Sequence, residues 1–462
     1  MTAPDTIIAL ATARGQAALA IVRLSGPDAV RIVASRFSGG GLAEAPSHTA
    51  HLGYLLGADG ERLDQVVVTL FRAPRSATGE DVVEVTTHGG DLAPQLVLRS
   101  LLDAGARLAE PGEFTQRAFL NGKLDLTQAE AVADLIHAQS GLAHRAALGR
   151  LEGRVAEAVG AVREALVQTT ALVELELDFS EEDVEFADRT QLADLLTEAD
   201  RLLTELLDSY RLGALVRDGV RVVIGGRPNA GKSTLLNALV ERDRAIVSAT
   251  PGTTRDEVEA EAHIDGLLFR FVDTAGLRDT ADAVEAEGVR RTRRAIERAD
   301  ALLYVFDATA GLDAEEAAFL DRLAAERPGL PVLPVANKTD LLPGLLPDDT
   351  GVPEGAFALS ARAALADPTT LDALRRALRE AVAADLADAE ASVLVVNERQ
   401  RRHLGAAREA VRRAREAVRL GTGGDTLALD LRAALHELGA VTGAITTEDV
   451  LGAIFSRFCI GK

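Results

Sequence analysis

The sequence predicts a multidomain α/β and α+β chain, with an N-terminal α+β domain, a helical domain in two parts, and an α/β domain inserted between those parts. Residues 1–118 alternate short apolar β runs with turn-rich segments, which is an α+β pattern. Residues 119–212 and 383–462 are Ala-, Leu-, Glu- and Arg-rich, and their apolar residues recur every three or four positions, as in packed helices. Residues 213–382 alternate strands with helical segments, which predicts a parallel sheet.

Particular segments support the first domain. Apolar runs over residues 6–12, 17–26 and 65–71 predict strands, and the stretch 92–105 predicts a helix. From residue 119 onward Gly and Pro become sparse, so we expect long helices in place of short strands and turns.

The inserted domain begins at the β run 221–226, which breaks into glycines and then opens a helix. Further strands are expected at 267–276, 301–309 and 331–340, with helical segments between them. This alternation is the pattern of βαβ units.

Composition restricts the functions that the chain can have. A formal charge of -21 disfavours a broad nucleic-acid footprint, because such footprints depend on clustered Lys and Arg. The single cysteine, Cys459, excludes an intrachain disulfide and a cysteine-rich zinc cluster. No signal-peptide pattern and no apolar run near 18 residues is present, so we expect a cytoplasmic protein with no membrane contact.

A phosphate-binding loop is predicted at Gly226–Thr234, GRPNAGKST, directly after a β run and before an amphipathic helix. The glycines let successive backbone N–H groups turn toward phosphates, and the helix N-terminus adds positive potential. Lys232 is expected to reach the β and γ phosphates, and Ser233 to offer its hydroxyl to magnesium. Only four lysines occur in the chain, so their positions inside motifs are informative.

Guanine recognition is predicted by three further motifs in the order that GTPases share. DTAG at Asp273–Gly276 ends a strand, where an Asp can hold magnesium through water. NKTD at residues 337–340 ends another strand, and Ser360-Ala361 follows the next. The carboxylate of Asp340 can accept the N1 and amino protons of guanine, whereas adenine would leave it unpaired. A decayed GTPase that no longer hydrolyses GTP is the competing interpretation.

The residue that orients the attacking water is not settled by chemistry alone. Leu277 stands where many GTPases have a glutamine, and an apolar side chain cannot orient water. Four acids of the following loop are candidates: Asp279, Asp282, Glu285 and Glu287.

A monovalent cation is predicted to supply the charge that an arginine finger gives other GTPases. Asn229 and the segment Ser248–Thr253 offer many uncharged oxygens, which suit a large cation such as potassium. We therefore expect potassium-stimulated hydrolysis.

The chain resembles the tRNA modification GTPases known as the MnmE or TrmE family. The resemblance rests on GRPNAGKST, ATPGTTRDEV, DTAGLR and NKTD inside the GTPase region. Outside that region it rests on VRLSG, TGEDVVEVTTHGG, PGEFTQRAFLNGKLDLTQAEAVADLI, ELDFSEEDVEF and the terminal FCIGK.

This resemblance implies a tetrahydrofolate-binding and dimerising N-terminal domain, a discontinuous helical domain and an inserted P-loop GTPase domain of the Ras-like α/β type. It implies a homodimer that works with an FAD-dependent partner, MnmG (GidA), as a heterotetramer, and that meets tRNA through the complex. The implied reaction adds an aminomethyl or carboxymethylaminomethyl group to carbon 5 of the wobble uridine of certain tRNAs. The implied cofactors are Mg²⁺, K⁺ and 5,10-methylenetetrahydrofolate, for which 5-formyltetrahydrofolate is an analogue, and GTP is the substrate.

The resemblance also assigns residues by motif. Glu285, nine residues past Gly276, matches the catalytic acid that orients water, and Lys232 is its catalytic partner at the phosphates. Magnesium is assigned to Ser233 and Thr254. Potassium is assigned to Asn229, Ser248, Thr250 and Thr253. The GTP contacts are Asn229, Ala230, Gly231, Lys232, Ser233, Thr234, Ser248, Thr250, Thr253, Thr254, Asp273, Thr274, Ala275, Gly276, Asn337, Lys338, Asp340, Ser360, Ala361 and Arg362.

The folate site is assigned to Arg23, Glu80, Lys123 and Lys462. A carboxylate suits the guanidine-like edge of the pterin, and cations suit the glutamate tail. Arg23 or Lys123 could equally serve a domain interface. Cys459 matches a family cysteine near the active centre, although a lone cysteine more often behaves as a small apolar residue.

Two alternatives remain open at this stage. The chain could be a GTPase switch in ribosome assembly without folate chemistry, in which case the folate residues and FCIGK would have no use. The arginine-rich stretch 397–420 could contact tRNA or the partner, or it could be an ordinary solvated helix face.

Overall fold

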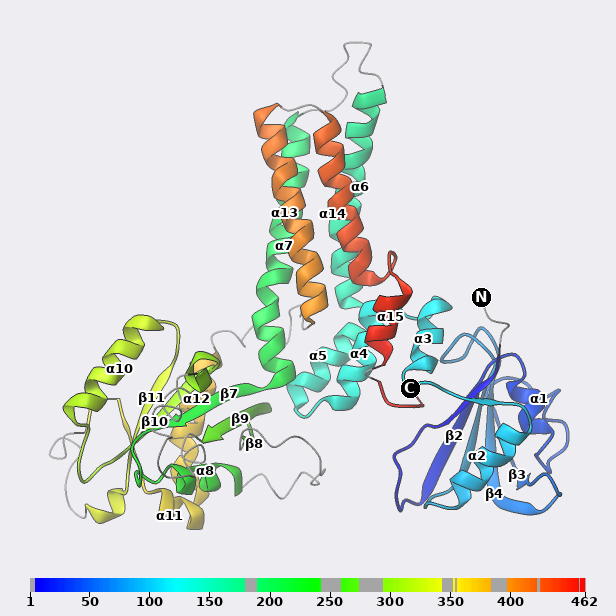
Figure 1. Cartoon of the computed structure of the whole chain (residues 1–462), viewed down its shortest axis with the longest axis horizontal. Helices are drawn as coiled ribbons and strands as arrows, with labels where there is room; N and C mark the ends of the chain where they lie inside the picture. The colour runs from blue at the N-terminus through cyan, green and yellow to red at the C-terminus, as the bar shows by residue number, and fades with distance from the viewer. Residues whose placement is uncertain are drawn as a thin grey trace, which may run out of the picture. The chain divides into compact units, whose positions relative to one another are not determined.

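The computed structural model confirms a multidomain α/β and α+β architecture (Figure 1). It describes residues 5–178, 189–241, 259–273, 294–342, 352–353, 355–383, 397–421, 424–456 and 458–461.

The chain forms two compact units. The first contains Met1–Ile136, Arg150–Thr204 and Arg402–Lys462, and the second contains His137–Gly149 and Glu205–Arg401. The domain limits expected after residues 118, 212 and 382 stay predictions, since compact units need not coincide with domains that fold separately.

The first unit begins with a six-stranded sheet in the order β3-β4-β5-β2-β1-β6. Neighbouring strands run antiparallel except β1 and β6, which are parallel. The elements of this α+β region are β1 (Ile7–Leu10), β2 (Leu19–Ser25), α1 (Ala29–Ala34), β3 (Thr49–Leu56), β4 (Arg62–Phe71), β5 (Val82–His88), α2 (Ala93–Asp103), β6 (Arg107–Leu108) and α3 (Glu113–Leu120).

The core of this region lies between one face of the sheet and helices α1 and α2. Along β4 the residues Val66, Val68 and Leu70 are buried in alternation, as expected for a strand with one face in the core. Val97 and Leu101 of α2 pack into the same cluster, four residues apart on one helix face. The opposite face of the sheet carries Arg23 on β2, one of the predicted site residues.

An ion-pair network fixes α3 against the start of β1. Arg107 donates from Nη2 to Oε1 of Glu113 at 2.7 Å and from Nε to Oδ2 of Asp5 at 2.7 Å. Arg117 donates from Nη2 to the same Glu113 oxygen at 2.9 Å and to Oδ1 of Asp5 at 2.6 Å. Burial opposes the ionisation of Glu113, but the hydrogen bonds from Arg107, from the Glu110 N–H and from Arg117 outweigh burial and lower its pKa.

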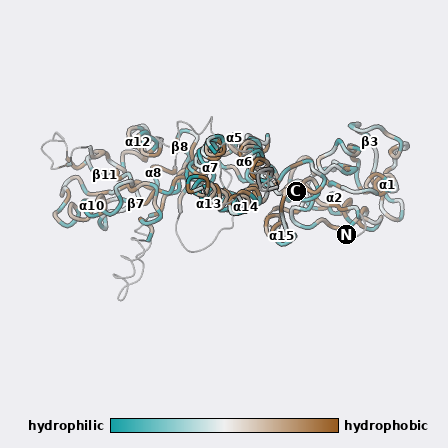
Figure 2. Tube along the Cα trace, turned by 90° about the horizontal axis from the view of Figure 1, so that it is seen from above, coloured by the Kyte–Doolittle hydropathy of each residue, from teal (hydrophilic) through white to brown (hydrophobic). Residues whose placement is uncertain are grey.

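The helical region follows in two stretches of sequence. Its helices are α4 (Leu126–His137), α5 (Gly141–Leu151), α6 (Arg154–Asp178), α7 (Arg189–Asp218), α13 (Glu398–Leu420), α14 (Gly424–Thr442) and α15 (Glu448–Phe455). Figure 1 shows α6, α7, α13 and α14 running side by side, and Figure 2 looks along them. Along α7 the residues Leu192, Leu196, Ala199 and Leu203 are buried, so the apolar spacing of three and four does form one packed face.

Ion pairs cross between these helices. Arg408 and Arg415 of α13 both pair with Asp200 of α7, at 3.1 and 2.5 Å. Arg413 of α13 pairs with Asp430 of α14 at 2.8 Å. Several arginines of the predicted arginine-rich stretch are therefore engaged within the bundle.

The second unit contains a six-stranded sheet in the order β12-β11-β10-β7-β9-β8. All neighbouring strands are parallel except β8 and β9, as the βαβ pattern predicts. Its elements are β7 (Val220–Gly225), α8 (Lys232–Glu241), β8 (Glu259–Ile264), β9 (Leu267–Asp273), β10 (Ala301–Asp307), α10 (Ala314–Glu326), β11 (Val332–Asn337), β12 (Phe357–Ala358), α11 (Ala361–Ala366) and α12 (Asp372–Ala383).

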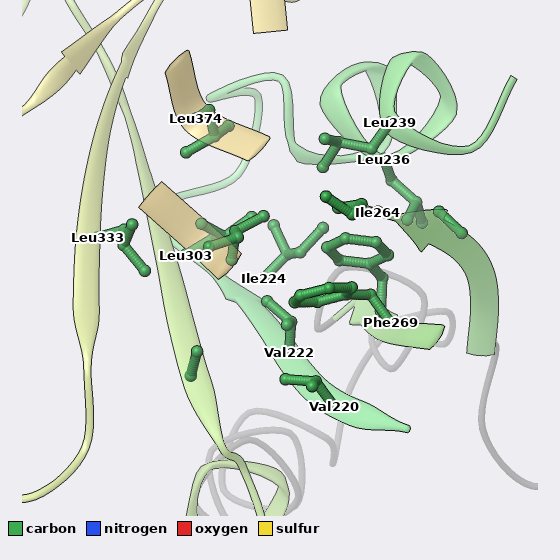
Figure 3. Packing of buried hydrophobic residues seen from close by; sticks show 14 of the residues in the cluster. Val220, Val222, Ile224, Leu236, Leu239, Ile264, Phe269, Leu303, Leu333 and Leu374 are labelled. Atoms are coloured by element: carbon green, nitrogen blue, oxygen red, sulfur yellow. The ribbon is translucent and has the colours of Figure 1, made fainter. Parts of the chain in front are cut away.

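Close packing behind the central strand β7 positions the ends of the parallel strands. Figure 3 shows Val222 and Ile224 of β7 packed with Phe269 of β9 and Leu303 of β10. Leu239 of α8 joins the same cluster, so this helix lies firmly on the sheet. Because these side chains are buried and closely packed, the strand ends that lead into the loops are held in fixed positions.

Across the described part of the chain, no helix is both long enough and apolar enough to cross a membrane.

We predict that Glu113→Gln will loosen α3. At pH 7 the change should remove charge-assisted hydrogen bonds and lower the local free energy of opening by about 1–3 kcal/mol. Because the pKa of Glu113 is lowered in the folded state, its contribution is fully present above the ordinary value of 4.5 and is lost as the pH falls from there through the lower pKa of the folded state. Hydrogen exchange of the α3 amides at pH 7 and near pH 4 measures this difference.

The exposed neighbour Glu110 offers a matched control, since Glu110→Gln removes the same charge without touching Arg107 or Arg117. Equal protection of α3 in the Glu113 and Glu110 variants at pH 7 would contradict the prediction.

Candidate functional site

A tight loop joins β7 to α8. Gly226 and Gly231 have φ values of +130° and +95°, in the region that favours glycine. A Cβ at Gly226 would lie 1.9 Å from the carbonyl oxygen of Val305, and a Cβ at Gly231 would lie 2.1 Å from Nδ2 of Asn337. The glycines therefore let the loop pass directly against β10 and the end of β11, with its N–H groups at the start of a helix.

Lys232 places a positive charge inside this loop. It is the first residue of α8, and only 6% of its surface is exposed. Its Nζ donates to the carbonyl oxygens of Gly226 at 3.0 Å and Arg227 at 2.7 Å. A cation enclosed by a glycine-rich turn provides the electrostatic environment that phosphate groups require.

The predicted magnesium ligand Ser233 lies beside the end of β9. Its Oγ donates to Oδ2 of Asp273 at 2.9 Å, and Asp273 is buried. A hydroxyl and a carboxylate in mutual contact are oxygen ligands of the kind that magnesium prefers, so these residues fit the ion. Thr254, the second predicted magnesium ligand, lies outside the described residues.

Asn337 joins the loops that the motifs predict. Its Nδ2 donates to the carbonyl oxygen of Ala230 at 2.8 Å, and its Oδ1 accepts from the N–H of Ala361 at 2.8 Å. The side chain is almost fully buried. Ser360 caps α11 by accepting from the N–H of Ala363, which orients the adjacent Ala361. Of the other predicted contacts in this region, Asp340 and Arg362 are exposed, as is Asn229, whereas Thr234 is half-buried.

Lys338 has a partner that the sequence interpretation missed. It adopts a left-handed conformation with φ of 69°, and its Nζ donates to Oδ2 of Asp307 at 2.7 Å. Thr309 donates from its hydroxyl and its N–H to the other oxygen of Asp307. Burial alone would raise the pKa of Asp307, but the hydrogen bonds from Lys338 and Thr309 lower it, so this carboxylate is ionised at neutral pH. An acidic residue at the carboxyl end of a parallel strand was the available signal.

Several predicted residues of this site lie outside the described part of the chain. They are Ser248, Thr250, Thr253, Thr254, Thr274, Ala275, Gly276 and Glu285. The potassium and water-orienting assignments therefore stay predictions.

The predicted folate residues Glu80 and Arg23 lie at neighbouring positions of the first unit. Ser25, two residues along β2 from Arg23, donates from Oγ to Oε2 of Glu80 at 2.7 Å. Arg117 donates from Nη1 to the same oxygen at 3.1 Å. Arg23 pairs through Nη2 with Oε1 of Glu84 at 2.7 Å. Glu80 therefore has protein partners that the sequence interpretation did not foresee, because they come from β2 and α3.

Lys123 lies beside the turn that carries Glu80. Its Nζ donates to the carbonyl oxygen of Pro74 at 3.2 Å. A Cβ at Gly79 would lie 3.3 Å from Cγ of Lys123, which places this side chain against the residue before Glu80. The structure thus brings Glu80 close to Lys123 as well as to the strand of Arg23.

The tail beyond α15 lies against the α+β region. The N–H of Gly112 donates to the carbonyl oxygen of Cys459 at 3.4 Å, and Pro111 and Ile460 form a β bridge. The side chain of Cys459 is exposed and its sulfur is a free thiol. Lys462 lies outside the described residues.

Comparison with known proteins identifies the family. Residues 6–123 match the family model described as GTP-binding protein TrmE N-terminus, and residues 126–459 match the model of the MnmE helical domain. The chain is 60% identical over 462 residues to the tRNA modification GTPase MnmE of Salinibacter ruber, with 100% of both chains covered. The chain belongs to the MnmE (TrmE) family.

Two more members of the MnmE family match the chain over almost their whole length. The protein of Chlorobium phaeobacteroides is 45% identical over 470 residues, covering 99% of this chain and 97% of that protein. The protein of Cytophaga hutchinsonii is 44% identical over 458 residues, covering 99% and 98%. Both carry the name tRNA modification GTPase MnmE. Membership of this GTPase family and the loop around Lys232 together identify a GTP-hydrolysing enzyme.

We predict that Asn337→Asp will weaken guanine-nucleotide binding about tenfold to a hundredfold, because a carboxylate cannot donate to the carbonyl oxygen of Ala230 and leaves it buried without that partner. The affinity for a fluorescent GDP analogue measures the effect. Asn237→Asp, an identical change on the exposed face of α8, serves as the control. Similar affinities for the two variants would refute the role of the Asn337 amide.

Proposed function

We propose that this chain hydrolyses GTP as part of a tRNA modification reaction. The proposed reaction adds an aminomethyl or carboxymethylaminomethyl group to carbon 5 of the wobble uridine of certain tRNAs. The observation that carries the proposal is the phosphate loop around Lys232 within a chain that aligns with MnmE proteins over its full length. The proposal places the reaction in the cytoplasm and the chain in a homodimer that works with an FAD-dependent MnmG partner.

In this proposal the chain's own residues bind and orient the nucleotide. Lys232 and the N–H groups of the loop bind the β and γ phosphates, and Asp340 selects guanine. Ser233, with Thr254, would hold Mg²⁺, which neutralises charge on the phosphates when it is bound. Glu285 would orient the attacking water, because Leu277 cannot do so.

A potassium ion is the proposed substitute for an arginine finger. Of the residues proposed to bind this ion, Asn229 lies within the described part of the chain. It is exposed in the phosphate loop. Its φ of 61° places it in the left-handed region, which asparagine and glycine tolerate best. An uncharged amide oxygen at this position suits a large monovalent cation.

We predict that GTP hydrolysis will be about tenfold or more faster in potassium than in sodium buffer, because the cation offsets charge in the transition state. Asn229→Gly should abolish most of this difference, since glycine accepts the backbone conformation but supplies no amide oxygen. Steady-state rates in matched potassium, sodium and caesium chlorides measure the effect. Equal rates of the natural chain in sodium and potassium would overturn the potassium proposal.

The proposed one-carbon donor is 5,10-methylenetetrahydrofolate, bound near Glu80. A carboxylate has about four acceptor positions, and Glu80 accepts from Ser25 at one oxygen and from Nη1 of Arg117 at both, so Oε1 keeps an acceptor position for a donor of the pterin edge. Arg23, Lys123 and Lys462 would then provide positive charge for the glutamate tail.

Nucleoside analysis of tRNA tests the proposed function as a whole. We expect cells that lack this chain to lose the wobble-uridine modification, the natural chain to restore it, and Lys232→Ala or Glu285→Ala to fail. Asn237→Asp should restore it, since Asn237 is exposed on α8 away from the loop contacts. A normal wobble uridine in the deletion strain would favour the ribosome-assembly alternative instead.

A further inference from the structure

Arg227, the second residue of the phosphate loop, connects Lys232 to the start of α10. Its carbonyl oxygen accepts from Nζ of Lys232 at 2.7 Å. Its guanidinium is directed to the acidic N-terminus of α10, where Nε lies 3.3 Å from Oε1 of Glu316 and the group also pairs with Asp313. One residue therefore contacts the catalytic lysine through its backbone and a distant helix through its side chain.

The two acids form the cap of α10. The side chain of Asp313 accepts from the N–H of Glu316 at 2.8 Å, and Oε2 of Glu316 accepts from the N–H of Asp313 at 3.1 Å. This reciprocal pair is a capping box. A capping box needs only acceptor atoms, so Ser or Asn at the first position and Gln at the second would serve it equally. The cap alone does not explain why both residues are charged.

Glu316 is held from three sides. Only 6% of its side chain is exposed, and Tyr304 of β10 donates from its hydroxyl to Oε1 at 3.1 Å. Burial, reinforced by the charge of Glu316, raises the pKa of Tyr304, so the hydroxyl keeps its proton and remains a donor. A buried carboxylate is costly unless it is hydrogen-bonded and paired, and Arg227 supplies the paired charge.

We propose that Arg227 is a positioning residue, and that its pairing with Asp313 and Glu316 holds the phosphate loop in the conformation that binds nucleotide. We call this set of three residues the Arg227 clamp. The side chain fixes where the Arg227 carbonyl lies, and that carbonyl orients Lys232. Without the clamp the loop would populate other conformations, and the apparent affinity would fall by the fraction of chains that remain competent. The inference rests on the proposed function only in requiring that the loop binds a guanine nucleotide.

The matched pair Glu316→Gln and Glu315→Gln tests the clamp. Glutamine at position 316 keeps the capping acceptor and the shape but removes the charge that faces Arg227. Glu315 is the exposed neighbour in the same first turn of α10, so Glu315→Gln removes an equal charge at the same helix end. We expect the Kd for GDP and the KM for GTP to rise roughly threefold to tenfold in Glu316→Gln, with kcat within about twofold, and Glu315→Gln to match the natural chain.

A double-mutant cycle separates positioning from simple helix capping. Arg227→Gln should raise KM as Glu316→Gln does, and the double variant should be no worse than either single variant. Arg227→Lys should recover part of the affinity because it keeps the charge but loses the guanidinium fork. Multiplied effects in the double variant, or a Glu316→Gln protein with lower Tm but natural KM, would overturn the proposal.

Failure of the clamp can be told apart from failure of the proposed function. If the natural chain binds no guanine nucleotide, the functional proposal fails first, and the clamp with it. If the natural chain binds GDP and Glu316→Gln binds it equally well, only the clamp is wrong.

Discussion

The buried amide of Asn337 is the contact on which the nucleotide site depends. It donates to the phosphate loop at Ala230 and accepts from the N–H of Ala361 at the start of α11, so two segments are fixed by one planar group. Only a side chain with both a donor and an acceptor can make both bonds, and at a buried position each lost bond is costly. The close approach of Gly231 to this amide leaves no room for a side chain at position 231. Residues more than one hundred positions apart are thereby held in one site.

Features that depend on local contacts could be predicted from the sequence, whereas features that depend on contacts between distant residues could not. The phosphate loop follows from spacing alone, because glycines at fixed positions and a lysine at the helix start are needed wherever such a loop forms. The parallel sheet follows from alternation of strands and helices. By contrast, the bond from Lys338 to Asp307 joins residues 31 positions apart, and only the pairing of β10 with β11 brings them together. The same is true of Arg227 and Glu316, since no residue near Arg227 in the sequence indicates that Glu316 is its partner.

The first unit shows a different limit. The resemblance of the motif identified Glu80 as a candidate site residue. It gave no indication that Ser25 and Arg117 donate hydrogen bonds to this carboxylate. Those bonds depend on strand register and on the placement of α3 by the network of Asp5, Arg107 and Glu113. The arginine-rich stretch illustrates the same point, because Asp200 lies far away in sequence yet pairs with Arg408 and Arg415. Charge in a sequence predicts that a partner is needed, whereas the fold determines whether the partner is internal.

The enclosure of Lys232 and the ionic bond of Lys338 have a consequence for chemical labelling. Acylating reagents need access to the amine, and the amine of Lys232 is enclosed and bonded to two carbonyl oxygens, whereas that of Lys338 is bonded to the carboxylate of Asp307. The chain has only four side-chain amines in all, because arginine takes nearly every other cationic position. An amine-directed reagent would therefore find few amines on the protein. Slow acylation of Lys232 and Lys338 would report on the state of the nucleotide pocket itself.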